Sequence, residues 1–190
     1  MNTFLKRRGP GLLVIVILLL GFVGFMFSRG GLEIQSPESS NLRSKKNKAA
    51  GSVEKVYDGD TVKVRLKNGK RVVIRILGID CPESKENDKC HQDEERGWLS
   101  CEEQIPLGQR AGEVARNLLL GDTVTLRSGT SKGFKQDVYD RRLAYIHMGN
   151  NTDFGLEMIR RGQCRDFSHR FEHPRMEQYQ AENQPVKPLE

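Results

Sequence analysis

The feature that most constrains the fold of this chain is a set of three short segments in which apolar and polar residues alternate. They cover residues 53–57, 61–66 and 71–77, with Asp58-Gly59 and Asn68-Gly69 between them. A period of two is typical of strands with one buried face, and Asp-Gly and Asn-Gly pairs are typical of tight hairpin turns. The segments therefore predict a three-stranded antiparallel meander.

Helical and further strand patterns follow the meander. They predict a helix opened by Pro106 and stopped by Gly121, strands at 123–127 and 142–147, a helix from 151 or 152 to 162, and a weak helix from 174 to about 182. The fold class is therefore mainly β with helices: a five-stranded OB-fold Greek-key barrel plus two to three helices. An SH3-like barrel would give a similar pattern.

An apolar segment precedes the predicted barrel. Residues 11–27 carry no charge, and as a helix they would span about 26 Å, enough for a thin or locally adapted bilayer. We expect residues 1–28 to be a transmembrane signal anchor, with a cleaved signal peptide as the alternative. The basic residues Lys6, Arg7 and Arg8 favour a cytoplasmic N-terminus. The folded part is then expected outside the cytoplasm, on the periplasmic or extracellular face, or secreted.

Charge is distributed unevenly along the chain. Residues 1–52 carry eight basic and two acidic residues, whereas residues 53–190 carry 23 of each kind. The formal charge of +6 therefore does not indicate a basic nucleic-acid-binding domain. We expect residues 29–51 to be a disordered basic linker, 52–170 to form the domain, and 171–190 to be a short C-terminal helix and tail.

Carboxylates and arginines gather at the ends of the predicted strands. These residues are Asp58, Asp60, Arg75, Asp80, Glu83 and Arg141. Hard divalent cations prefer carboxylate and carbonyl oxygens, and the planar guanidinium group of arginine matches two phosphate oxygens. A metal, a carboxylate base and two arginines are the parts that cleavage of a phosphodiester bond requires. The pattern predicts a nuclease.

Three separated motifs resemble the staphylococcal nuclease (thermonuclease) family. They are Asp58-Gly59-Asp60-Thr61, Arg75 followed by Asp80-x-Pro82-Glu83, and Asp137-x-Tyr139-x-Arg141-x-Leu143-Ala144-Tyr145. The resemblance extends from about residue 52 to residue 167. It implies an OB barrel that uses Ca²⁺ to hydrolyse DNA and RNA with little sequence specificity and leaves 3′-phosphates.

The resemblance also implies how the metal would be held. Asp60 and Asp80 would bind Ca²⁺ through their carboxylates, and Cys81 through its backbone carbonyl. Asp58 would lie behind these ligands without touching the metal. The best-known member has threonine in place of Cys81, a change that a backbone ligand tolerates.

The remaining roles concern the substrate. Glu83 would orient or deprotonate the attacking water, Arg75 and Arg141 would clamp the phosphate, and Tyr139 would donate a hydrogen bond to it. The residues alone leave alternatives open. Arg75 could be a structural partner of Glu83, and Tyr139 could serve core or surface packing.

The chain departs from the family pattern at two places. Asp140 replaces a glycine, and its carboxylate could pair with Arg141 and slow the enzyme. Residues 84–104 form a longer, acidic insertion flanked by Cys90 and Cys101. We expect a disulfide between these two cysteines, with a metal site that includes His91 as the alternative. Cys81 and Cys164 could also pair, but the connectivity stays open.

The competing function is a non-catalytic, membrane-tethered OB-fold module that binds single-stranded nucleic acid. A membrane-anchored interaction protein would rest on the acidic insertion alone. The complete set of carboxylates and arginines favours the enzyme, with DNA or RNA as substrate. We expect a monomer that contacts the membrane through its N-terminal helix.

Overall fold

The structure is a computed structural model that describes residues 46–168, 170 and 172–186. The expected signal anchor at 1–28 and most of the expected linker, residues 29–45, lie outside the described residues. Within the described ranges, no helix combines the length and the apolar character needed to cross a membrane.

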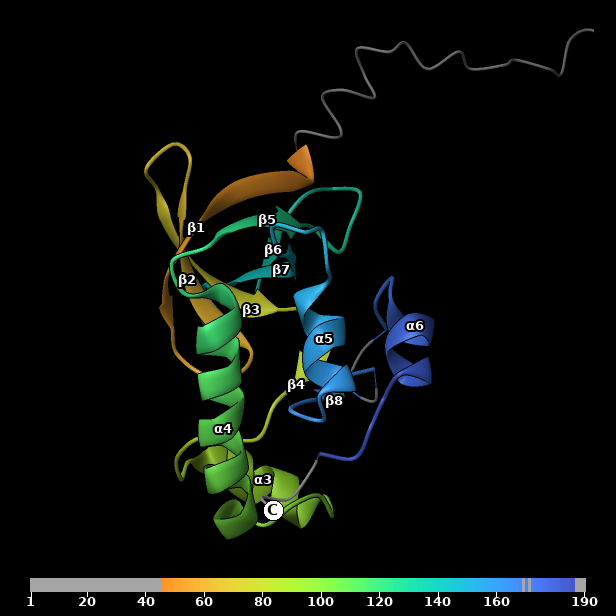
Figure 1. The fold of residues 1–190 in the computed structure, drawn as a ribbon. Coiled ribbons are helices and arrows are strands. Elements are labelled where there is room, and N and C mark those ends of the chain that lie inside the picture. Colours follow the sequence, from red (N-terminus) through yellow and green to blue (C-terminus); the bar gives the residue numbers. More distant parts are fainter. Residues whose placement is uncertain (1–45, 169, 171, 187–190) are drawn as a thin grey trace, which may run out of the picture. The chain divides into compact units, whose positions relative to one another are not determined.

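Five strands close into a barrel (Figure 1). They are β1 (Lys48–Val56), β2 (Thr61–Leu66), β3 (Arg71–Ile76), β5 (Thr123–Arg127) and β7 (Arg142–His147). Neighbours in the order β3-β2-β1-β5-β7 are antiparallel, and β3 returns to pair in parallel with β7. The short strand β6 (Lys135–Gln136) also pairs with β7. This closed arrangement fits the OB barrel that the alternation predicts.

The first strand begins earlier than expected. Residues Lys48 to Ser52 pair with β5, so β1 reaches into the segment that we expected to be a linker. Ala49 packs against the core, and Gly51 lies too close to the backbone of Arg65 for any larger residue. These small residues give little periodic signal beside a run of lysines, so the pattern of alternation predicts a boundary at 52.

The barrel interior and two helices share one core. The strands contribute buried aliphatic side chains, among them Val53, Val62, Val64, Ile74, Ile76, Val124, Leu126, Ala144 and Ile146. Helix α4 (Cys101–Leu119) adds Ala111, Ala115 and Leu119, and α5 (Phe154–Arg160) adds Phe154 and Met158. Burial of this apolar surface is the main term that stabilises the domain.

Helix α4 begins at Cys101, five residues before the predicted start at Pro106. Ser100 caps the helix by accepting a hydrogen bond from the backbone N–H of Glu103, whose carboxylate accepts one from Ser100 in return. Pro106 lies in the second turn. A proline can begin a helix, but here the reciprocal cap of Ser100 and Glu103 sets the boundary.

The described residues include four complete helices, more than the two to three that we predicted. The additional helix is α3 (Asp88–Glu95), in the acidic insertion next to α4. It has no apolar stripe that periodicity could reveal. Instead Asn87 caps its N-terminus, and a disulfide joins Cys90 to Cys101 at the start of α4.

The last helix, α6 (Met176–Ala181), belongs to the domain rather than to a tail. Its Tyr179 is fully buried and makes edge contact with the ring of Tyr145. The Tyr179 hydroxyl donates to Asp153 at 2.9 Å. Asp153 also caps α5, in place of the residue at 151 or 152 that we predicted. The expected domain end at 170 therefore cuts through the core.

A second disulfide holds a two-stranded ladder beneath the barrel. Strands β4 (Ile79–Asp80) and β8 (Arg165–Asp166) pair antiparallel, with Asp80 opposite Arg165. Cys81 and Cys164 form the next pair of the same register, and a disulfide joins them across 83 residues of sequence. The covalent bond therefore keeps Asp80 and Arg165 facing each other.

We predict that replacing both Cys81 and Cys164 with alanine lowers the free energy of unfolding by about 3–4 kcal/mol, because a long loop is released in the unfolded chain. Replacing Cys90 and Cys101, which are 11 residues apart, should cost about 2–3 kcal/mol. Urea unfolding without reductant measures both. A larger cost for the Cys90–Cys101 pair would contradict the loop-length argument.

Candidate active site

A pocket of about 300 Å³ opens where the ends of several strands meet. Its polar lining consists of Asp58, Asp60, Thr61, Arg75, Glu83, Lys89, Asp137 and Arg141. Phe167 also lines it, and the Arg75 guanidinium lies 5.6 Å from the centre of that ring. The structure thus brings together carboxylates and arginines that are up to 83 residues apart in the chain.

Barrel closure explains this convergence. Thr61 at the start of β2 pairs with Arg75 on β3, and Arg75 in turn pairs with Leu143 on β7. The turn before β2 and the loop before β7 therefore flank Arg75 from opposite sides. The pairing of β3 with β7 is the step that sequence order alone does not reveal.

Asp60 bridges two parts of the pocket. One carboxylate oxygen, Oδ2, lies 3.2 Å from Arg75 Nη2 and accepts a hydrogen bond from the Cys81 backbone N–H at 3.2 Å. The other oxygen accepts from the Thr61 hydroxyl at 3.0 Å. A Cβ on Gly59 would lie 2.7 Å from Cys81 Sγ, so the turn can approach only with glycine at this position.

Asp80 lies behind the pocket and is fully buried. Arg165 donates to its Oδ2 through Nη2 at 2.7 Å and Nε at 3.0 Å. Lys89 Nζ lies 3.2 Å from Oδ1, and Arg75 Nη2 lies 3.6 Å from it. Burial by itself raises the pKa of Asp80, but these three cations outweigh it and lower the pKa.

Glu83 contacts the insertion, not Arg75. Its Oε2 accepts from Asn87 Nδ2 at 2.7 Å, and its Oε1 lies 3.1 Å from Lys89 Nζ. Arg75 instead uses Nη1 to donate to the Ile76 and Ile79 carbonyls, each at 2.9 Å. The alternative in which Arg75 serves as a structural partner of Glu83 is therefore wrong.

The carboxylate that holds Arg141 is Asp137, not Asp140. Asp137 Oδ2 accepts from Arg141 Nε at 2.7 Å, and Oδ1 accepts from the Arg141 backbone N–H. Asp140 is exposed and has a φ of 59°, a left-handed conformation that aspartate tolerates better than most residues. The expected pairing of Asp140 with Arg141 is therefore wrong, because the turn directs the Asp137 carboxylate at the arginine.

Tyr139 lies at the rim of the site. It is 75% exposed, and the Arg141 guanidinium lies 5.3 Å from the centre of its ring. This exposure excludes the alternative in which Tyr139 packs into the core. The ring is free to meet a ligand above Arg141.

Asp58 also lines the pocket, and its side chain points towards the backbone of the turn that precedes β2. Its Oδ1 accepts a hydrogen bond from the Asp60 backbone N–H at 3.0 Å. Burial and then the negative charge of Asp60 raise the pKa of Asp58 to about 7.

The residues fit a hard divalent cation by their chemistry. Asp60, Asp80 and Glu83 offer carboxylate oxygens, the ligands such ions prefer. Asp80 Oδ1 is buried and has no hydrogen-bond partner within the described part of the chain, although two cations lie near it. The side chain of Cys81 is engaged in a disulfide, so only its backbone carbonyl could serve as a ligand.

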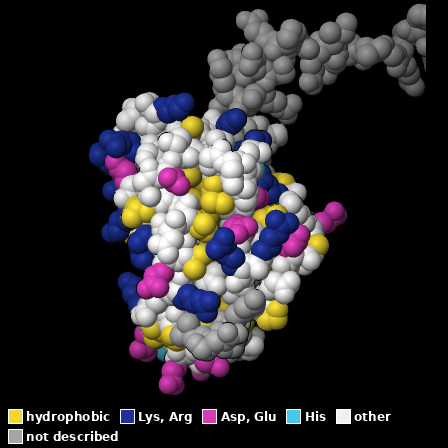
Figure 2. Space-filling view, in the orientation of Figure 1, with side chains coloured by type: hydrophobic (Ala, Val, Ile, Leu, Met, Phe, Trp, Pro, Cys, Tyr) yellow, Lys and Arg dark blue, Asp and Glu magenta, His cyan; other side chains and the backbone are white. Residues whose placement is uncertain are grey.

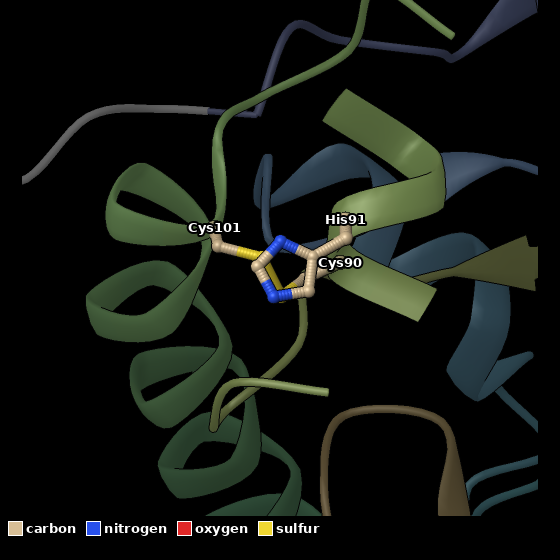
Figure 3. A group of neighbouring side chains, drawn as sticks. All are labelled: Cys90, His91 and Cys101. Carbon is tan, nitrogen blue, oxygen red and sulfur yellow. A yellow bond between two sulfur atoms is a disulfide. The ribbon is translucent and has the colours of Figure 1, made fainter. Parts of the chain in front are cut away.

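The insertion does not hold the alternative metal site. Figure 3 shows the His91 ring of α3 beside the bond between Cys90 and Cys101, and His91 Nδ1 lies 3.3 Å from Cys101 Sγ. Both sulfurs are consumed in the disulfide, so neither offers the thiolate that a metal such as zinc would bind. The disulfide that we expected is present instead.

Four residues close to the site were not predicted from the sequence: Lys89, Asp93, Asp137 and Arg165. Asp137 is the first residue of the motif that contains Tyr139 and Arg141, but the motif alone predicts no role for it. Arg165 could have been found by assuming the Cys81–Cys164 disulfide, because antiparallel register then places it opposite Asp80. Lys89 and Asp93 lie in an insertion rich in charged residues, so nothing in the sequence distinguishes them as site residues. The acidic side chains of this region gather at the end of the domain where α3 lies (Figure 2).

We predict that Asp58→Asn stabilises the metal-free protein more at pH 8 than at pH 5. The folded pKa of about 7 exceeds the ordinary value of 3.8, so the folded state loses stability as pH rises from about 4 through 7. Asparagine keeps the hydrogen-bond acceptor without the charge, and the gain at pH 8 should be roughly 1–3 kcal/mol. Thermal unfolding in chelator measures it.

The matched control is Asp122→Asn, which removes an exposed aspartate from the turn before β5. Its effect should be small and equal at the two pH values. Equal stabilisation by Asp58→Asn at pH 5 and pH 8 would contradict the raised pKa.

The chain is similar in sequence to several known proteins, among them a thermonuclease and an endonuclease. Thermonuclease of Staphylococcus hyicus is 27% identical over 187 residues, which cover 96% of each chain. Endonuclease YncB of Bacillus subtilis is 32% identical over 117 residues, covering 62% of this chain and 46% of that protein. The uncharacterized protein MJ1439 of Methanocaldococcus jannaschii is 32% identical over 128 residues, covering 64% and 61%.

The chain thus spans about half of the length of YncB and less than two thirds of MJ1439. Residues 73–187 match the family model described as "Staphylococcal nuclease homologue". This match covers more than half of the chain and includes Arg75, Asp80, Glu83 and Arg141. The chain belongs to the family of staphylococcal nuclease homologues.

Proposed function

We propose that this protein is a calcium-dependent endonuclease that hydrolyses phosphodiester bonds of DNA or RNA with little sequence specificity. The observation that carries the proposal is that Asp60, Glu83, Arg75 and Arg141 line one pocket, with Asp80 directly behind it. Membership of a nuclease family, and relatives named thermonuclease and endonuclease, support the same reaction class.

In this proposal Asp60, Asp80 and the Cys81 carbonyl hold the metal. A bound Ca²⁺ would supply a Lewis acid that polarises a phosphoryl oxygen. Asp58 keeps Asp60 in place through the hydrogen bond to the Asp60 backbone N–H. Asp60 is further positioned by Thr61 and Arg75.

Glu83 orients or deprotonates the water that attacks phosphorus. Its carboxylate lines the pocket, and its side chain is 23% exposed, so a water molecule can reach it. Asn87 holds one of its oxygens at 2.7 Å, which restricts the direction of the other. A carboxylate within hydrogen-bonding reach of water is what general base catalysis requires.

Arg75 and Arg141 neutralise charge on the phosphate as the attacking oxygen adds. Guanidinium groups fixed before the reaction stabilise developing charge without reorganisation in the transition state. Arg75 is fixed by the Ile76 and Ile79 carbonyls, and Arg141 by Asp137. Tyr139, exposed beside Arg141, would donate a hydrogen bond to a phosphate oxygen. Departure of the 5′-oxygen would leave a 3′-phosphate.

The alternative is a module that binds single-stranded nucleic acid without cutting it. Such modules combine a basic groove with aromatic rings that stack on bases. Figure 2 shows acidic side chains among the basic ones over the face in view. The carboxylates that a binding module does not need are present in the pocket, so the enzyme is the better supported function.

We also propose that the domain acts as a monomer outside the cytoplasm, tethered by residues 1–28 or released by their cleavage. Two disulfides support an oxidising compartment, because the cytosol keeps thiols reduced.

We predict that the full-length chain, in mild detergent, cuts DNA or RNA when Ca²⁺ is present and not in chelator. Glu83→Gln should lower kcat by about 10²–10⁴, and Arg141→Ala by about 10³. Product ends should be 3′-phosphates, which a phosphatase assay identifies. Binding of single strands without cutting, unchanged by both substitutions, would establish the binding module instead.

A further prediction concerns Asp137. Asp137→Asn should lower kcat about tenfold, since Arg141 loses the charged partner that fixes its direction. Asp140→Asn, which removes an equivalent charge three residues away, is the matched control and should leave kcat within about twofold. Equal losses in the two variants would show that Asp137 acts only through net charge.

A further inference from the structure

Lys89 occupies an unusual position, because its ammonium group touches three carboxylates at once. Lys89 Nζ lies 2.8 Å from Asp93 Oδ2, 3.1 Å from Glu83 Oε1 and 3.2 Å from Asp80 Oδ1. Of these three carboxylates, Glu83 lines the pocket described above and Asp80 lies directly behind it. The lysine comes from α3, in the insertion, rather than from the barrel.

The oxygen of Asp80 that faces Lys89 is the one available to a cation. Asp80 Oδ2 is saturated by two hydrogen bonds from Arg165. Asp80 Oδ1 is buried without a hydrogen-bond partner among the described residues, and Lys89 Nζ is the nearest of its cations. A divalent cation bound at Oδ1 would meet the ammonium group, which also contacts the Glu83 carboxylate that would orient the attacking water.

The backbone of Lys89 is fixed by its neighbours in α3, whereas its side chain can move away from Asp80 and Glu83. Asn87 caps α3 and also donates to Glu83, and Cys90, the residue after Lys89, is bonded to Cys101 of α4. The side chain of Lys89 is 36% exposed. Asp93 lies one turn further along α3 and remains a partner if the ammonium leaves the other two carboxylates.

We infer that the ammonium group of Lys89 competes with the divalent cation for Asp80 Oδ1, so that the metal binds only as Lys89 leaves Asp80 and the neighbouring Glu83. Two positive charges at one buried carboxylate repel strongly. The inference rests on the proposed function, since it concerns the cation of that same site. It gives the insertion a role: it sets the calcium concentration at which the site fills.

Calorimetric titration of the full-length chain with calcium chloride tests the inference. Lys89→Met keeps the aliphatic length without the charge, and it should bind Ca²⁺ about tenfold or more tightly than the wild type. Lys89→Arg keeps a charge and should stay close to wild-type affinity. Circular dichroism before titration verifies that each variant is folded.

The matched control is Lys85→Met, which removes a lysine from the same insertion. Lys85 is exposed and takes part in none of the ion pairs of the described residues. Its affinity for Ca²⁺ should change by less than about twofold. An equal gain in the Lys85 and Lys89 variants would attribute the effect to net charge and overturn the inference.

A second measurement follows the ammonium group directly. In ¹⁵N spectra of lysine ammonium groups, the Lys89 signal should shift as Ca²⁺ saturates the wild-type chain, and the Lys85 signal should not. Equal affinity of the wild type and Lys89→Met, or an unmoved Lys89 signal at saturation, would overturn the competition and leave the nuclease proposal intact. Absence of Ca²⁺ binding in every variant would overturn both, and the cleavage assay in chelator would then show whether a metal-independent activity remains.

Discussion

The buried charge of Asp80 is the constraint on which the rest of the site depends. A carboxylate taken out of water without partners costs several kcal/mol, so the fold must bring cations to it. Arg75 comes from β3, Arg165 from β8 and Lys89 from α3. The Cys81–Cys164 disulfide continues the ladder that places Arg165 opposite Asp80. One buried anion thus connects the barrel, the short ladder and the insertion.

The same network explains why the pocket is rigid on one side and adjustable on the other. Arg75 is fixed by two backbone carbonyls, and Arg165 is stacked 3.3 Å from the centre of the Trp98 ring. Among the described residues, the partners of Lys89 are side-chain carboxylates, and Lys89 is partly exposed. Replacing the ammonium group of Lys89, on its flexible four-carbon chain, by another cation costs less free energy than replacing the stacked guanidinium group of Arg165. Of the three cations around Asp80, the one that can be replaced is therefore Lys89, which comes from the insertion.

Local patterns predicted much of the fold and of the site. Alternation predicted β1, β2 and β3, and further strand patterns predicted β5 and β7. Motif order indicated which carboxylates and arginines would meet, and Asp60, Arg75, Glu83 and Arg141 do line one pocket. Signals failed where a boundary depends on small or polar residues. The start of β1, the Ser100 cap of α4 and the whole of α3 are examples, because hydrogen bonds and a disulfide rather than apolar periodicity stabilise them.

The barrel strands, the family resemblance and the candidate residues follow from the amino-acid sequence, because these depend on side-chain chemistry and on spacing along the chain. The partner of each charged residue, in contrast, depends on how the chain folds. Asp137 rather than Asp140 holds Arg141, Glu83 contacts Lys89 rather than Arg75, and Arg165 faces Asp80 from 85 residues away. Ion pairs of this kind depend on distances of a few ångströms between distant segments. Those distances are set by barrel closure and by two disulfides, neither of which local sequence periodicity encodes.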